Sequence, residues 1–162
     1  MEVLWAPWRM NYITGLHQGG NGCFLCLSPE HRGPDRDRLV LYSNSVVLVM
    51  MNLYPYSNGH LLVSPRRHIP SLLAADEIER LALINQVARA TDILGRIIRP
   101  KGFNLGVNQG RVSGGSVEEH LHFHVTPRFP GDSNYMAVLG ETRVISEHIL
   151  ITYDKLVAAF NE

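Results

Sequence analysis

Residues 118–129 read EEHLHFHVTPRF, and three histidines within them stand at every second position: His120, His122 and His124. The residues between and after the rings are apolar: Leu121, Phe123 and Val125. A β-strand turns successive side chains to opposite faces, so residues two apart project from the same side. On a helix the three rings would spread over about 200° of arc and could not act together. The alternation therefore predicts a strand with a row of imidazoles on one face and a hydrophobic core on the other.

Around this segment, the pattern of apolar residues predicts an α+β domain with an antiparallel sheet. We expect further strands at 39–42, 46–51, 60–64 and 103–108, separated by segments rich in turn-forming residues. Apolar residues near a 3.6-residue repeat predict a long helix over 76–99 and a C-terminal amphipathic helix over about 146–160. The expected fold is thus a sheet of about five strands with two helices.

The length of 162 residues suits a single domain. We divide it into an N-terminal extension with a CxxC motif (1–38), a core (39–128) and a C-terminal extension (129–162). Fifteen basic residues balance fifteen acidic ones, so there is no overall basic field that would hold a nucleic acid. The longest apolar run, 46–51, is too short to cross a membrane, and no signal peptide is evident. We therefore expect a cytoplasmic protein whose two cysteines stay reduced.

Three interpretations of the histidine row are open. It could be a solvated face, a metal site, or a nucleophilic imidazole whose two neighbours fix its tautomer and polarise it. The stretch 108–116, NQGRVSGGS, favours the nucleophile, because its glycines let successive backbone amides approach an anion. A nucleophile beside an anion-binding loop is typical of phosphoryl or nucleotidyl transfer.

The motif CFLC places Cys23 and Cys26 three positions apart. The pair could be redox-active, two incidental buried thiols, or half of a zinc site. The redox interpretation would require a thioredoxin-like unit, which the pattern around the motif does not predict. A zinc site needs two further ligands, which the motif alone does not identify.

The sequence HLHFHV at residues 120–125 resembles the signature of the histidine-triad (HIT) family, His-φ-His-φ-His-φ-φ with φ apolar; Thr126 stands at the last φ. The resemblance extends from about residue 23 to 128 and includes NLYPYSNGHLLV at 52–63. The stretches 5–13, 114–124 and 131–145 resemble a bacterial subgroup that includes diadenosine polyphosphate phosphorylases. It implies a HIT-like fold over the whole chain and a homodimer.

The resemblance implies catalytic roles for four histidines. His122 would attack the α-phosphorus of an adenine nucleotide and carry it covalently to water or inorganic phosphate; the leading hypothesis is phosphorolysis of diadenosine polyphosphates. His124 would contact the phosphate or leaving group, while His60 would lie beside His122 and set its tautomer. His120 completes the catalytic set. The implied nucleotide contacts are His124, Asn52 at the ribose, and Asn108, Gly114, Gly115 and Ser116 at the phosphates.

The resemblance also implies a structural zinc site formed by Cys23, Cys26, His68 and His120. No cofactor is expected to take part in the chemistry. The segment around the triad has no P-loop lysine, and Arg111 and Arg128 have no evident role. We therefore expect backbone amides and a protonated histidine to stabilise the negative charge that develops on the phosphate during the reaction. The alternatives are a hydrolase of dinucleoside polyphosphates or nucleoside phosphoramidates, a non-catalytic zinc-stabilised nucleotide-binding module, and a metalloenzyme that uses the triad as ligands.

Overall fold

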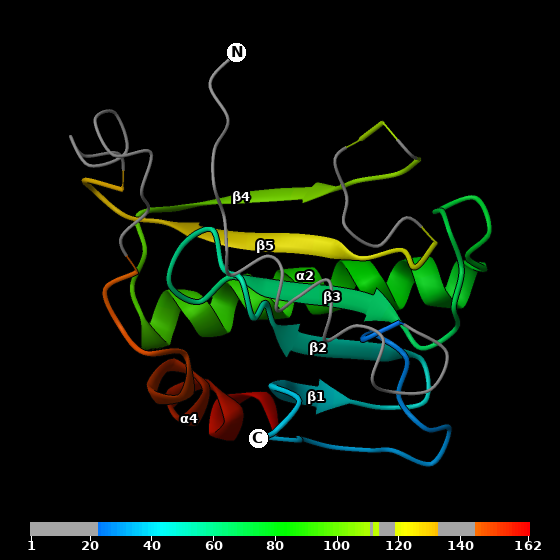
Figure 1. Cartoon of the computed structure of the whole chain (residues 1–162), viewed down its shortest axis with the longest axis horizontal. Coiled ribbons are helices and arrows are strands. Elements are labelled where there is room, and N and C mark those ends of the chain that lie inside the picture. The colour runs from blue at the N-terminus through cyan, green and yellow to red at the C-terminus, as the bar shows by residue number, and fades with distance from the viewer. Residues whose placement is uncertain (1–22, 111, 114–118, 133–144) are drawn as a thin grey trace.

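The computed structural model describes residues 23–110, 112–113, 119–132 and 145–162. Five strands form one antiparallel sheet in the order β1-β2-β3-β5-β4, and a long helix and a C-terminal helix pack beside it (Figure 1). The expected α+β class is confirmed. The elements are β1 (Val40–Ser43), β2 (Val47–Met51), β3 (Leu61–Pro65), α2 (Glu77–Ile97), β4 (Gly102–Val107), β5 (Phe123–Arg128) and α4 (Ile149–Phe160).

The expectation that all three triad histidines lie within one strand is wrong. β5 begins only at Phe123, which pairs with Val63 and Val107, so His124 is in the strand while His120 and His122 precede it. Just before β5, the amide of Leu121 donates a hydrogen bond to the carbonyl of Ile69 at 2.7 Å rather than to a neighbouring strand. The apolar side of the prediction is confirmed, since Leu121 and Val125 are buried and Phe123 packs against the core. His120 and His122 are buried too, which excludes a solvated face.

Local signals explain where α2 and the first hairpin begin. The Asp76 carboxylate accepts from the Glu79 amide at 2.8 Å, and the Glu79 carboxylate accepts from the Asp76 amide at 3.0 Å. This reciprocal pair is a capping box, which satisfies two amides that the first turn of a helix leaves unpaired. Between β1 and β2, Oδ1 of Asn44 accepts from the amides of Val46 and Val47, each at 2.8 Å, and so closes the turn.

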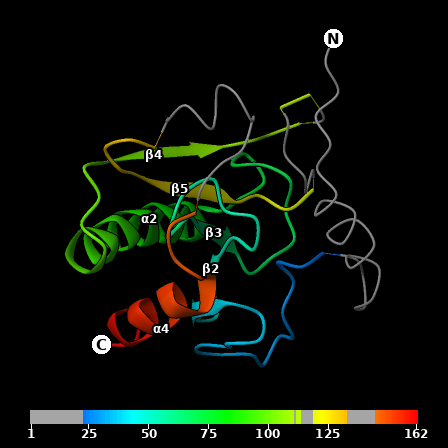
Figure 2. The ribbon, with the colours of Figure 1, turned by 60° about the vertical axis from the view of Figure 1, so that its left-hand side comes forward.

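The core lies between one face of the sheet and the two helices. A second, smaller cluster on the opposite face packs Leu25 against Val40, Leu48, Met50 and Leu62. Figure 2 shows α2 and α4 on one side of the sheet and the segment after residue 23 on the other. Because Leu25 is fully buried there, the neighbouring cysteines are held close to the strands. Neither described helix is long and apolar enough to cross a bilayer.

Candidate functional site

The ring of His120 is oriented by a backbone carbonyl. Its Nε2 lies 2.9 Å from the carbonyl oxygen of Pro65, which can only accept, so Nε2 carries the proton and donates. The lone pair of Nδ1 then faces the two thiols, with Cys23 Sγ at 3.3 Å and Cys26 Sγ at 3.6 Å. Burial lowers the pKa of His120 to about 4, so the ring is neutral at pH 7 and Nδ1 is available as a ligand.

The middle ring, His122, is fixed in the opposite tautomer. Its Nδ1–H donates to the carbonyl oxygen of His120 at 2.8 Å, which leaves the lone pair on Nε2. Burial lowers the pKa of His122, and the hydrogen bond to the carbonyl opposes that shift only in part. A neutral imidazole with its free lone pair on one defined atom is the form in which histidine acts as a nucleophile.

The tautomer of the third ring, His124, is fixed by a hydrogen bond from His60. The amide of Tyr56 donates to Nδ1 of His60 at 3.1 Å, so the proton of a neutral His60 ring is on Nε2. That Nε2–H donates to Nδ1 of His124 at 3.0 Å, which places the proton of His124 on its own Nε2. This Nε2 is buried and has no hydrogen-bond partner within the described part of the chain. His124 therefore offers an unused N–H donor, and its ring centroid is 4.9 Å from that of His122.

His60 was expected beside His122, but the triad ring to which it is hydrogen-bonded in the structure is His124. The strand register explains the difference. Leu61 pairs with Val125 and Leu62 with His124, so His60 lies diagonally across from His124 on the same face. The tautomer of His122 is set instead by the His120 carbonyl. The expectation of a protonated histidine also changes, because burial, followed by the proximity of His122, lowers the pKa of His124 to about 4.

The low pKa of His124 predicts a pH-dependent stability. Its ordinary value is 6.5, so between about pH 6.5 and 4 the unfolded chain binds a proton that the folded chain excludes. The stabilisation is fully present above pH 6.5 and is lost as the pH falls toward 4. We expect wild type to lose about 1–2 kcal/mol more between pH 7 and pH 4.5 than His124→Gln, after allowance for solvent screening of a partly buried ring.

Urea unfolding at the two pH values measures this difference. Leu73→Gln, at an exposed position with no titratable group, is the control and should retain the wild-type pH dependence. Equal losses in wild type and His124→Gln would show that burial of this ring contributes nothing to acid sensitivity.

The other expected nucleotide contacts divide into two groups. Asn52 lies in a turn, where its Oδ1 accepts from the amide of Tyr54 at 3.0 Å and its Nδ2 is 3.3 Å from Nδ1 of His60. Asn108 follows β4 and lines the cavity described next. Gly114, Gly115 and Ser116 lie outside the described residues, as does Arg111. The roles assigned to all of these residues stay predictions.

A cavity of about 760 Å³ opens beside His124 on the face of the sheet opposite α2. Its floor is formed by β4 and β5, and its walls include residues 56–58 and 129–132. Thr126 and Arg128 continue along β5 at the two-residue spacing that starts at His124, so all three share one face. The histidine motif alone does not predict this surface, although the same alternation, followed two steps beyond the third histidine, reaches it.

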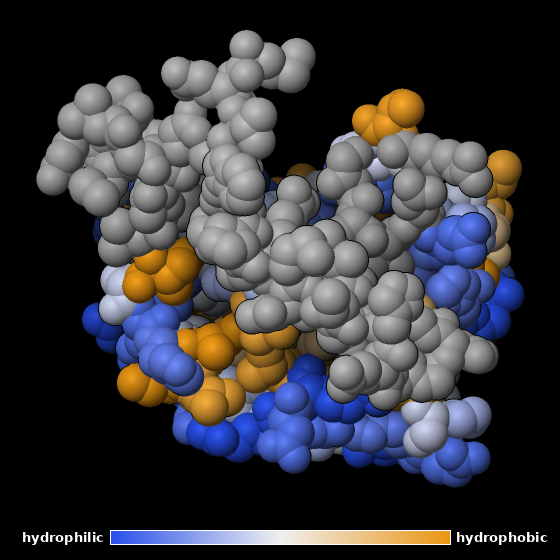
Figure 3. All heavy atoms as spheres, viewed as in Figure 1, coloured by the Kyte–Doolittle hydropathy of each residue, from blue (hydrophilic) through white to orange (hydrophobic). Residues whose placement is uncertain are grey.

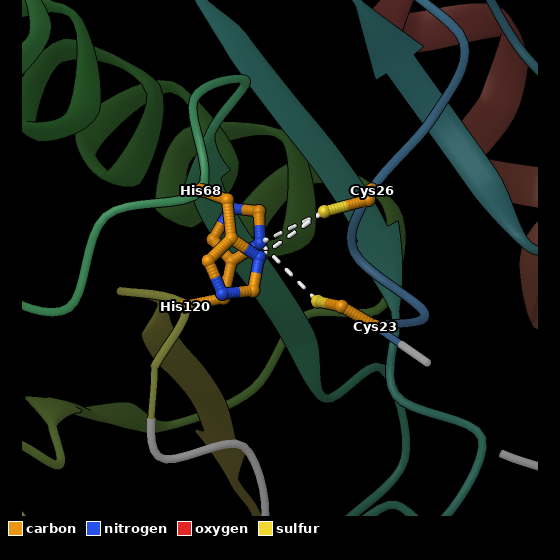
Figure 4. Close-up of side chains that lie close together, drawn as sticks. All are labelled: Cys23, Cys26, His68 and His120. Atoms are coloured by element: carbon orange, nitrogen blue, oxygen red, sulfur yellow. Dashed lines mark hydrogen bonds between the residues drawn. The ribbon is translucent and has the colours of Figure 1, made fainter. Parts of the chain in front are cut away.

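The predicted zinc ligands come together from three distant segments. The ligand atoms of Cys23, Cys26, His68 and His120 all lie within 4.8 Å of one another. The two ring centroids are 4.8 Å apart, and Figure 4 shows a nitrogen of each ring facing the thiols. Nδ1 of His68 is 3.3 Å from Cys26 Sγ, and His120 is as close to Cys23. A tetrahedral zinc ion places its nitrogen and sulfur ligands about 3.3–3.8 Å apart. The three Sγ–Nδ1 distances of 3.3, 3.3 and 3.6 Å are in that range, and the donor set of two thiols and two imidazoles suits that metal.

The protonation states support a metal-binding role for this cluster. Burial, and then the proximity of Cys26, raises the pKa of the Cys23 thiol to about 11. A divalent cation reverses that preference, because it binds the thiolate directly. The carbonyl of Pro65 meanwhile holds His120 with its lone pair toward the thiols, as an outer-shell partner does in metal sites.

Comparison with known proteins places the chain among histidine-triad proteins. The family model described as HIT domain matches residues 34–131. AP-4-A phosphorylase of Mycobacterium tuberculosis (strain CDC 1551 / Oshkosh) is 36% identical over 152 residues, which cover 91% of this chain and 78% of that protein. The asymmetrical bis(5'-nucleosyl)-tetraphosphatase of Schizosaccharomyces pombe is 29% identical over 93 residues, covering 57% of this chain and 50% of that protein.

Solved structures agree on the fold. A Hit-like protein from Bartonella henselae superimposes with a TM-score of 0.61 at 25% identity, covering 75% of this chain and 86% of that one. A histidine triad family protein from Mycobacterium smegmatis, described as Zn-bound, gives a TM-score of 0.63 at 22% identity, with coverages of 76% and 84%. With the HIT-domain match spanning more than half of its length, the chain belongs to the histidine-triad (HIT) family.

Proposed function

We propose that this protein is a nucleotidyltransferase that cleaves diadenosine polyphosphates by phosphorolysis, through a covalent nucleotidyl-histidine on His122. One observation carries the proposal. The His120 carbonyl holds the proton of His122 on Nδ1, so Nε2 is the nucleophilic atom, and the proton-bearing Nε2 of His124 belongs to the adjacent ring. The 36% identity to an AP-4-A phosphorylase over 91% of this chain supports the choice of substrate.

In the first step, Nε2 of His122 attacks the α-phosphorus, and the bond from phosphorus to the bridging oxygen breaks. From diadenosine tetraphosphate this releases ATP and leaves AMP bound to the ring. Because Nε2–H of His124 has no hydrogen-bond partner among the described residues, it is available to donate to the departing oxygen. In the second step, an oxygen of inorganic phosphate attacks the same phosphorus, the P–N bond breaks, and ADP leaves. Covalent capture thus divides one displacement into two easier ones.

We propose that zinc is bound by Cys23, Cys26, His68 and His120 and has a structural role. The metal would supply a fixed positive charge that ties the CxxC segment to the start of the triad. Held in this way, His120 presents its carbonyl to His122 in a constant direction, which secures the tautomer of the nucleophile. A reducing cytoplasm, the location we propose, keeps both thiols available as ligands.

Product analysis tests the choice of acceptor. Diadenosine tetraphosphate is incubated with the enzyme with and without inorganic phosphate, and the nucleotides are separated by anion exchange. We expect ADP and ATP in equal amounts, formed only when phosphate is present. AMP and ATP formed without phosphate would assign water as the acceptor, the alternative suggested by the tetraphosphatase relative. No cleavage of any dinucleotide or phosphoramidate, with nucleotide binding intact, would identify a binding module.

We also propose that two copies of the chain associate through the β4 edge and the outer face of α2. The β1 edge is already covered, because the Gly33 amide donates to the Ser43 carbonyl and Asp35 bridges to Val40. Figure 3 shows hydrophilic residues along this lower edge. Within the described sheet, β4 pairs with β5 alone. Three α2 side chains, Ile78, Leu81 and Ile84, are more than half exposed. A two-fold axis would pair the two β4 edges and keep both helices on one face.

Charge introduced on α2 should separate the two copies. We expect the double variant Leu81→Glu, Ile84→Glu to be monomeric by light scattering at micromolar concentration, while wild type is a dimer. Both positions are exposed in the single chain, so the fold should be retained. Ile151→Glu, at an equally exposed position on α4, should remain dimeric. A monomeric wild type, or a dimeric double variant, would contradict this interface.

A further inference from the structure

Arg128 lies on the same face of β5 as His124, four residues further along the strand, at the far end of the cavity. The strand rise puts the two Cα atoms about 13 Å apart. Its Nε donates to Oδ2 of Asp132 at 2.8 Å, and its Nη1 donates to Oδ1 of Asn104 at 2.7 Å. Nη2 takes part in none of the hydrogen bonds among the described residues. Two of the three guanidinium nitrogens are therefore fixed, and within the described part of the chain the third is left available to a ligand.

The surface between His124 and Arg128 is small and polar. On β5 the intervening residue of the same face is Thr126, and on β4 Gly106 pairs with His124 while Asn104 pairs with Thr126. A Cβ atom added at Gly106 would meet no heavy atom within 4 Å, so this part of the floor is open. We call this floor, formed by His124, Thr126, Arg128, Asn104 and Gly106, the β4–β5 track.

The charges along the cavity favour an anion. Among the described lining residues, Arg128 is the only Lys or Arg, and the Asp132 carboxylate is already engaged by that guanidinium and by the Phe129 amide. The track thus starts at an N–H donor on His124 and ends at a guanidinium held in a fixed orientation. Guanidinium groups bind phosphate through short, charge-assisted hydrogen bonds.

On the basis of the proposed function, we propose that the β4–β5 track binds the phosphate chain of the leaving nucleotide, with Arg128 contacting the phosphates farthest from the cleaved bond. The incoming α-phosphate is attacked beside His124, so the departing chain has to leave along a surface that adjoins this ring. The track provides such a surface and carries the only arginine of the described lining. Arg128 thereby selects substrates whose leaving group is a polyphosphate over those whose leaving group is small and uncharged.

A comparison of two substrates tests the selection. Diadenosine tetraphosphate releases a polyphosphate, whereas adenosine 5'-phosphoramidate releases ammonia from the same α-phosphorus. We expect Arg128→Gln to lower kcat/KM for the tetraphosphate about 10- to 100-fold, the loss typical of one charged hydrogen bond, and to change the phosphoramidate reaction less than threefold. Arg128→Lys should recover part of the loss. Equal effects on the two substrates, or none on either, would overturn the proposal.

Two further measurements separate this inference from its alternatives. Asp132→Asn removes the ion pair but keeps the Arg128 cation. If the pair were merely structural, this variant would lower kcat/KM for both substrates as much as Arg128→Gln does. We expect only a small change in kcat/KM for each substrate. Calorimetric titration of ATP and AMP into His122→Ala needs no turnover. There, adding Arg128→Gln should weaken ATP about tenfold and leave AMP unchanged. If no substrate is cleaved but ATP binding is weakened in this way, the proposed function is contradicted and the role of the track is supported. If the substrates are cleaved but ATP binding is unchanged, only the role of the track is contradicted.

Discussion

Replacing His122 by alanine is expected to reduce the turnover of diadenosine tetraphosphate by about 10⁴-fold or more and to leave nucleotide binding within a few-fold of wild type. The expected loss is large because, in the proposed mechanism, the substitution removes the atom that forms the covalent bond, and neither of the other two triad rings has its lone pair placed in the same way. Nδ1 of His124 accepts from His60, and Nδ1 of His120 faces the thiols. Initial rates by anion-exchange chromatography measure the effect.

The matched variant is His124→Ala, which removes a proton donor rather than the nucleophile. We expect a smaller loss, about 10²- to 10⁴-fold, with labelled nucleotide still trapped on the protein after an acid-free quench. No label should be trapped on His122→Ala. A His122→Ala enzyme that retains near wild-type turnover, or label recovered on another residue, would remove the basis of the mechanism.

The second large effect is on stability. We expect the purified protein to contain about one zinc per chain, and Cys26→Ser to release it and lower Tm by more than about 10 °C. A structural zinc ion contributes its binding free energy to folding, and about 3–4 kcal/mol is enough for a shift of this size in a domain of this length. Cys26 is the ligand that contacts both rings, at 3.3 Å from His68 and 3.6 Å from His120. Calorimetry and atomic absorption give the two quantities.

His122→Ala serves again as the control, because it should keep its zinc and its Tm within about 3 °C of wild type. The comparison also tests the hypothesis that the triad is a catalytic metal site, which predicts loss of metal from that variant. Protein isolated without zinc, with a Tm that chelators do not change, would show that the four residues form a cluster of thiols and rings with no resident ion.

The sequence predicted the elements well because its signals are local. Apolar periodicity placed α2 and α4 within a few residues, and the turn around Asn44 separated β1 from β2 as expected. Boundaries moved where the backbone departs from the pattern. Leu39 was expected to begin the first strand, but it has a φ of 59°, which a strand does not allow, and β1 starts at Val40.

The candidate site depends on contacts between distant residues, which periodicity does not report. His60 and His124 are 64 positions apart, and only the β3–β5 register decides which triad ring His60 meets. Cys23 and His120 are 97 apart, and the zinc ligands were predicted from the family resemblance rather than from spacing. The alternation of the triad correctly separated apolar from imidazole side chains. The alternation could not show that His120 and His122 precede strand β5 and are oriented by hydrogen bonds to backbone carbonyls.

The hydrogen bond from the Tyr56 amide to Nδ1 of His60 limits how His124 can regain a proton. A backbone amide does not give up its hydrogen at neutral pH, so the amide of Tyr56 cannot resupply a proton to His124 through His60. In the proposed mechanism, a proton that His124 donates to the departing nucleotide would then be replaced from the side of the cavity. An incoming acceptor that carries its own acidic hydrogen, as inorganic phosphate does, would restore the ring while completing the reaction. The second half-reaction would then return His124 to the protonated form that the first half-reaction requires.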